Sequence, residues 1–127
     1  MKGYTTMEDT TTDPQDPGDE LLTVDSSTFN AEVLECAGPI AVEFMSYGCS
    51  FCRTIEPVVR KVAEMVRSKE KIVRINIGQD QDLADKYRVE ATPSFLMFLN
   101  GKLVGRIEGP SPTVASVLTA VTHPFNV

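Results

Sequence analysis

The sequence predicts one α/β domain, with a central mixed β-sheet flanked by helices on both faces. Three apolar runs of strand length, at 40–45, 72–77 and 94–99, alternate with segments whose apolar residues recur at helical spacing. Asn100-Gly101 follows the third run and joins it to a fourth at 103–107. Strands separated by helices favour parallel pairing, whereas Asn-Gly between two strands is typical of an antiparallel hairpin. Both kinds of pairing in one sheet make it mixed.

The region before the first long strand is expected to hold a short strand and a helix. Residues 21–24 form a short apolar run suited to a strand. Asn30 is expected to cap the N-terminus of a helix that carries Val33 and Leu34 on its apolar side. Gly38-Pro39 should end that helix.

The next two elements are expected to be a buried strand and a long amphipathic helix. The run 40–45 is apolar except for Glu43, which favours a central strand covered on both faces. The helix is expected from about Ser50 to Ser68. Pro57 falls inside its apolar pattern and should kink it.

The second half of the chain continues the alternation and then departs from it. We expect a strand at 72–77, a short helix at 80–87, the two hairpin strands, and a final helix at 111–121. The predicted order is therefore β-α-β-α-β-α-β-β-α.

Composition divides the chain into an acidic tail and a nearly neutral body. The net charge of the 127 residues is −6, and 1–20 account for −5 of it, because six carboxylates stand there against Lys2. We expect 1–20 to be a disordered acidic tail and 21–127 to be the folded domain, a monomer. Neither part has a basic stripe for nucleic acid or a basic amphipathic face for membranes. No apolar stretch reaches the length of a membrane span and no secretory signal is visible, so the expected compartment is cytoplasmic.

The strongest chemical signal is the Cys49-Ser50-Phe51-Cys52 segment between the first long strand and the long helix. Thiols three residues apart across such a junction are close enough to form a small disulfide ring. The first thiol lies where unpaired backbone N–H groups and the helix dipole stabilise a thiolate. The pattern therefore indicates a reversible dithiol–disulfide couple.

A metal site is the alternative interpretation of two closely spaced cysteines. A zinc knuckle needs a second ligand pair, and the remaining candidates, Cys36 and His123, are single residues in different regions. We therefore expect no metal, with a site shared between two chains as the remaining alternative. Cys36 is expected to be a structural thiol, and a regulatory thiol is the alternative.

Several features in the same order resemble the thioredoxin family over 21–121. The strand that leads into the cysteines, the helix proline, the cis-proline loop, the hairpin and a late glycine all have counterparts. They are Val42-Glu43-Phe44 through Cys52, Pro57, Ala91-Thr92-Pro93-Ser94-Phe95, Asn100-Gly101 and Gly109. The resemblance implies a thioredoxin-like fold and a thiol–disulfide oxidoreductase that needs no bound cofactor.

The resemblance also implies the roles of three catalytic residues. Cys49 would attack a protein disulfide and Cys52 would resolve the mixed disulfide. Glu43 stands where the family has a buried acid, and would exchange a proton with Cys52. The alternative is that Glu43 is merely paired with a cation such as Arg74. A thioredoxin-reductase-type electron donor is implied as a partner.

Substrate contacts are implied around the same cysteines. Pro93 would be cis, and would bring the backbone of Thr92 beside Cys49, where an extended substrate segment can pair with it. Gly48, Phe51 and Gly109 are the further substrate-binding candidates. For Phe51, packing against the helix is an equally good interpretation.

The motif also departs from the family pattern. Tyr47-Gly48 precede the first cysteine where Trp is usual, Ser50-Phe51 replace Gly-Pro, and the chain has no Trp. These changes should alter the relative stability of dithiol and disulfide. They leave open the substrates, the electron donor and the direction of exchange. A binding or adaptor module with little general reductase activity is therefore the alternative function.

Overall fold

Five strands form one mixed sheet in the computed structural model, which describes residues 21–126. The strands are β1 (Leu22–Thr23), β2 (Pro39–Met45), β3 (Lys71–Asn76), β4 (Ser94–Leu99) and β5 (Lys102–Glu108). Their order across the sheet is β1-β3-β2-β4-β5. The pairs β1/β3 and β2/β3 are parallel, whereas β2/β4 and β4/β5 are antiparallel. The predicted mixed sheet is confirmed, and β2 lies at its centre.

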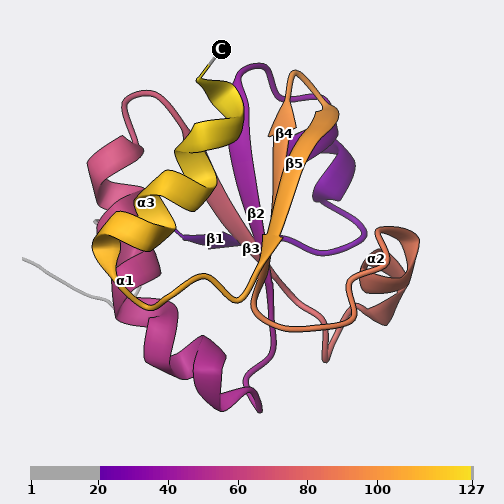
Figure 1. The fold of residues 1–127 in the computed structure, drawn as a ribbon. Helices are drawn as coiled ribbons and strands as arrows, with labels where there is room; N and C mark the ends of the chain where they lie inside the picture. Colours follow the sequence, from indigo (N-terminus) through magenta and orange to yellow (C-terminus); the bar gives the residue numbers. More distant parts are fainter. Residues whose placement is uncertain (1–20, 127) are drawn as a thin grey trace, which may run out of the picture.

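Helices cover both faces of this sheet (Figure 1). Two of them, α1 (Ser50–Val66) and α3 (Val114–Thr122), lie side by side on one face. The other face carries α2 (Gln81–Lys86) and a short helix, η1 (Asn30–Leu34). A 3₁₀ turn, η2 (His123–Phe125), follows α3. Pro57 lies inside α1, as the sequence predicts.

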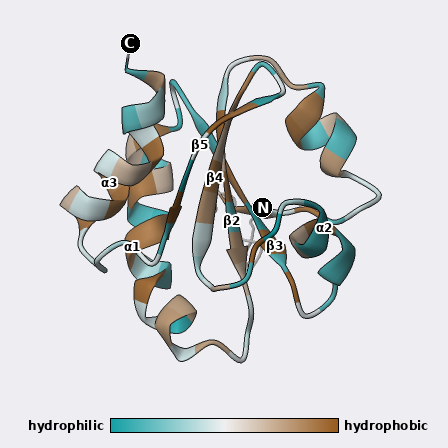
Figure 2. Ribbon diagram, turned by 45° about the vertical axis from the view of Figure 1, so that its right-hand side comes forward, coloured by the Kyte–Doolittle hydropathy of each residue, from teal (hydrophilic) through white to brown (hydrophobic). Residues whose placement is uncertain are grey.

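The strand β2 divides the core into two clusters because its side chains alternate between the faces. Val42 and Phe44 join the cluster with η1 and α2, in which Phe29, Tyr87 and Phe98 form a group of ring contacts. Ala41 packs with the apolar residues of α1 and α3 on the other face. Figure 2 shows the matching alternation of brown and teal along α1, whose apolar side meets the sheet. By this alternation Glu43, which is buried, belongs to the α1 face.

The structure corrects two predicted helix starts. Asn30 is not the N-cap of the first helix but its first residue; the N-cap is Phe29, whose side chain makes no capping hydrogen bond. The segment winds as a π-helix, in which the Glu35 N–H donates to the Asn30 carbonyl at 2.8 Å. The chain is instead turned just upstream, where the Asp25 carboxylate accepts the N–H groups of Ser27 and Thr28.

The final helix begins at Val114 rather than Ser111. Thr113 is its N-cap, with a side-chain oxygen that accepts the Ser116 N–H at 3.1 Å. A hydroxyl at this position satisfies one of the N–H groups that a helix leaves unpaired, and so fixes where the helix begins. The predicted tail at 1–20 lies outside the described residues, so its character stays a prediction.

Candidate active site

Cys49 and Cys52 lie together at the N-terminus of α1. Figure 1 shows this end of the helix after the loop that follows β2. Cys49 is the N-cap residue, with extended backbone angles, and its sulfur accepts the Cys52 N–H at 3.1 Å. The Cys49 N–H donates in turn to the Ser46 carbonyl at 3.1 Å, which fixes the loop. Both sulfurs are free thiols here; Cys49 is half-buried and Cys52 is buried. The geometry places the more accessible sulfur where a helix terminus offers N–H donors to an anion.

The two thiols differ in acidity. Burial alone would raise the pKa of Cys49, but hydrogen bonds from Cys52, Thr92 and the Phe51 backbone outweigh it and lower that pKa. Burial, and after it the hydrogen bond with Cys49, raise the pKa of Cys52 to about 11. Near neutral pH the first sulfur is therefore much closer to its thiolate form, which is the nucleophilic form of a cysteine. The second thiol needs a base before it can react.

The loop at Thr92-Pro93 lies against the reacting sulfurs. The peptide bond between the two residues is cis, as the resemblance implied. Cys49 Sγ contacts the Thr92 carbonyl oxygen at 3.6 Å, so the backbone of Thr92 lies beside the sulfur as expected. The side chain of Thr92 also lowers the pKa of both cysteines by hydrogen bonding. The resemblance implied a role only for the backbone of Thr92, and the hydroxyl at this position was a signal in the sequence that pointed to its side chain.

Two further substrate-binding candidates lie next to this loop. The Gly109 N–H donates to the Pro93 carbonyl at 2.9 Å, and Gly109 has a positive φ of +55°. A Cβ added there would lie 3.5 Å from Phe51 Cε2. Phe51 is half-buried and its ring therefore lies against the Gly109 backbone rather than wholly in solvent. Gly109 therefore contacts both the Phe51 ring and the cis-proline loop.

The residues before the first cysteine are open to solvent. Gly48 is exposed and has no side chain to cover the sulfurs, and Tyr47 is exposed to 60%. Arg53, which follows the second cysteine, donates from Nη1 to the Tyr47 carbonyl at 2.8 Å. The guanidinium therefore holds the loop, and it is not one of the main influences on the pKa of Cys49.

Glu43 is a buried carboxyl on the α1 face of β2, only 3% exposed. Burial raises its pKa to about 7, against smaller lowering by the Arg74 guanidinium. The pKa prediction is confirmed, since a carboxyl removed from water keeps its proton to higher pH. Arg74 does not form an ion pair with Glu43 but with Glu56, at 3.1 Å. The alternative in which Arg74 merely neutralises Glu43 is therefore wrong in this geometry.

Glu56, one helical turn after Cys52, is a further residue near the site that the sequence patterns did not predict. Its carboxylate binds Arg60 at 2.8 Å and Arg74 at 3.1 Å. The i,i+4 spacing of Glu56 and Arg60 is the signal that was available, because such pairs are neighbours on a helix surface. The ion pair between Glu56 and Arg74 has no such signal in the sequence, because it depends on how α1 lies across β3.

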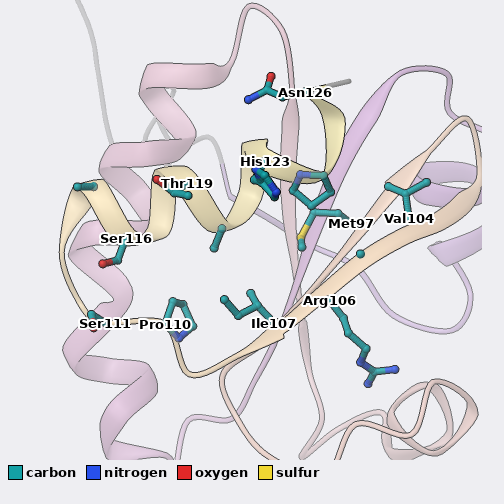
Figure 3. Close-up of a pocket in the computed structure, with 14 residues that line it drawn as sticks. Met97, Val104, Arg106, Ile107, Pro110, Ser111, Ser116, Thr119, His123 and Asn126 are labelled. Carbon is teal, nitrogen blue, oxygen red and sulfur yellow. The ribbon is translucent and has the colours of Figure 1, made fainter.

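A groove of about 880 Å³ lies elsewhere, between β5, α3 and η2 (Figure 3). Its walls include Met97, Ile107, Pro110, Thr119 and His123, and neither Cys49 nor Cys52 lines it.

Within 21–126, no three or more His, Cys, Asp or Glu residues are grouped so that they could hold a metal ion. No helix of the same residues is long and apolar enough to cross a membrane.

Comparison with known proteins agrees with this geometry. A family model described as Thioredoxin matches residues 20–120. The chain belongs to the thioredoxin family. It is 31% identical to thioredoxin 1 of Nostoc sp. over 79% of this chain and 94% of that protein. It is 32% identical to thioredoxin 1 of Synechococcus elongatus, over 75% and 91%. Against the chloroplastic M-type thioredoxin of Chlamydomonas reinhardtii it is 33% identical, over 79% and 71%.

Family and geometry together give this thioredoxin-family chain its activity. It is a thiol–disulfide oxidoreductase, with Cys49 and Cys52 side by side as the redox-active pair. Two neighbouring thiols of unequal acidity suit such exchange, because the thiolate is the form that attacks a disulfide sulfur.

Proposed function

We propose that this chain is a protein-disulfide reductase in which Cys49 attacks and Cys52 resolves. The lowered pKa of Cys49 and its greater accessibility support that order. The Cys49 thiolate attacks one sulfur of a substrate disulfide, forms a mixed disulfide and expels the other substrate sulfur as a thiolate. Cys52 then attacks Cys49 Sγ, which forms the Cys49–Cys52 disulfide and releases the second substrate thiol. Two electrons pass to the substrate, so the protein ends oxidised.

The second step needs a proton acceptor, and we assign that role to Glu43. The Cys52 thiol has a pKa of about 11 and must lose its proton to attack. Glu43 has a pKa of about 7 and is buried on the face that α1 covers. A base is most effective when its pKa lies near the working pH, because both of its forms are then available.

Substrate docking is assigned to the loop around the cis peptide bond. An extended segment of a protein disulfide would pair with the backbone of Thr92, beside the Cys49 sulfur. Pro93, Gly48, Phe51 and Gly109 would form the rest of that surface. Regeneration requires a thioredoxin-reductase-type electron donor. The resulting electron transport would serve redox homeostasis in the cytoplasm, with the chain acting as a monomer.

The observation that carries this proposal is the Cys52 N–H donated to Cys49 Sγ at 3.1 Å. It is tested by the midpoint potential of the couple, by thiol labelling across a graded redox buffer. A value near ~−270 mV makes the chain a reductant, whereas ~−180 to −120 mV makes it an oxidant or isomerase. Cys49→Ser should abolish reduction of a protein disulfide, and Cys52→Ser should accumulate mixed disulfides on Cys49. Undiminished reduction by Cys49→Ser would refute the mechanism.

A further inference from the structure

Glu43 and Arg74 occupy adjacent positions in one row across the sheet. Arg74 on β3 is the register partner of Glu43 on β2 and of Thr23 on β1. Paired positions on neighbouring strands are separated by about 5 Å, so a long guanidinium side chain reaches the carboxyl beside it. An acid and a base placed in this way usually form an ion pair, and the ion pair keeps the carboxylate charged.

Arg74 is instead drawn away from Glu43 by contacts with two other elements. Its Nη1 lies 3.1 Å from Glu56 Oε2 on α1, and its Nε donates to Thr23 Oγ1 at 3.1 Å. The Arg74 side chain is only 12% exposed, so these contacts fix it within the packed layer between sheet and helix. Glu56 is fixed as well, because Arg60 donates to the same oxygen through Nε at 3.0 Å.

The charged groups that act on Glu43 come from two elements. Burial is the largest influence and raises its pKa; Arg74 on β3 lowers it, Glu56 on α1 raises it, and Arg60 on α1 lowers it. The neighbouring position on β4 is Phe95, which carries no charge. Glu56 thus works against the Arg74 cation in two ways, through its own negative charge and by holding the guanidinium.

We propose that Glu56 is a positioning residue of the exchange reaction, which holds the Arg74 guanidinium against α1 and so keeps that cation from pairing with Glu43. The proposal rests on the proposed function of Glu43 as the base for Cys52. A carboxylate paired with Arg74 would be too weakly basic for that thiol, because an opposite charge stabilises its deprotonated form. The competing explanation is that the Glu56–Arg74 contact merely fastens α1 to β3.

The test measures the pKa of Glu43 directly, by carbon NMR titration of the labelled carboxyl in the full oxidised chain, where no active-site thiol titrates. Glu56→Gln removes the charge and keeps the shape. It is expected to lower the pKa of Glu43 by about one unit or more, because Arg74 is then free to approach. Glu64→Gln, at an exposed position on the same helix, is the matched control and should leave that pKa unchanged. An unchanged or raised Glu43 pKa in Glu56→Gln would overturn the proposal.

A double-mutant cycle separates the positioning effect from the charge of Glu56 itself. If Glu56 acts by holding Arg74, the shift caused by Glu56→Gln should fall to less than half in an Arg74→Gln background. A shift of full size in that background would show that Arg74 is not involved, and would also overturn the proposal. A merely structural contact would change the melting temperature, and the shift of the Glu43 titration would then be equally large with and without Arg74.

The kinetic consequence is measured separately, in the reduced chain. Glu56→Gln should move the acidic limb of the pH profile for the Cys52-dependent release step to lower pH, by the same amount as the Glu43 titration. If NMR shows the shift of the Glu43 pKa but the pH profile of the release step is unchanged, Glu56 still positions Arg74, but Glu43 is not the base. If neither moves, the positioning itself is refuted.

Discussion

The two faces of the sheet are built from the same strands but hold different kinds of residue. Phe44 on β2 faces η1 and α2, where ring contacts and apolar side chains fill the space. One residue earlier, Glu43 faces α1, where it is buried near Arg74, Glu56 and Arg60. The first face stabilises the fold through apolar burial. The second face holds a buried acid, which lowers the stability of the fold when it is charged. The comparison shows that one position along a strand separates packing from chemistry.

The largest expected effect on stability is on the aromatic face. Phe98→Ala should lower the free energy of unfolding by about 3–5 kcal/mol, because it leaves a cavity beside Phe29 and Tyr87. Urea denaturation measures that loss. Leu103→Ala, at a residue 42% exposed, is the control and should cost within about 0.5 kcal/mol. The midpoint potential of folded Phe98→Ala should equal that of the parent; a shift would show that the faces are not separate.

Substitutions in a protein core usually lower the free energy of unfolding. Glu43→Gln should instead raise it relative to the parent as pH rises. The folded-state pKa of about 7 lies above the ordinary value of 4.5, so folding favours the protonated acid. This group therefore costs nothing below pH 4.5, and its cost grows until pH passes 7. The stability of the variant relative to the parent should rise by about 3 kcal/mol between acid and alkaline pH.

Denaturation of parent and Glu43→Gln across that pH range measures this change. The difference should instead stay constant if Glu43 is ionised normally, and that result would contradict the buried-acid interpretation. The same variant should slow the Cys52-dependent release step by about 10²-fold or more, since it lacks the base. An undiminished release rate would remove Glu43 from the mechanism while leaving its effect on stability intact.

The smallest effect concerns the loop that reaches the active site from β4. Thr92→Val keeps the backbone and removes the hydroxyl, whose hydrogen bond lowers the pKa of Cys49. We expect the Cys49 pKa to rise by about half a unit, which corresponds to somewhat less than the free energy of one neutral hydrogen bond. Thiolate absorbance against pH in the reduced chain measures it. Thr113→Val, a threonine at the start of α3 far along the chain, is the control and should leave the Cys49 pKa unchanged. A fall in the Cys49 pKa of Thr92→Val would contradict the assigned hydrogen bond.

Local sequence patterns anticipated most of the fold and the two cysteines. Apolar runs and the Asn100-Gly101 turn predicted the strands and their mixed pairing, because side-chain period and turn geometry are properties of neighbouring residues. Two helix boundaries were wrong: Asn30 is the first residue of its helix and not its N-cap, and the last helix begins at Val114 and not at Ser111. Thr113 caps the last helix, whereas Asp25 turns the chain before the first helix without capping it.

The order of residues along the chain is enough to place two thiols at a strand-to-helix junction and one acid, Glu43, within a buried strand. Whether Glu43 forms an ion pair with a neighbouring cation depends on how the helices and strands pack. Arg74 lies next to Glu43 in the sheet, yet it binds Glu56 because α1 crosses above β3 at that point. Charge pairing between segments depends on distances of a few ångströms across packed elements, and no spacing along the chain encodes those distances.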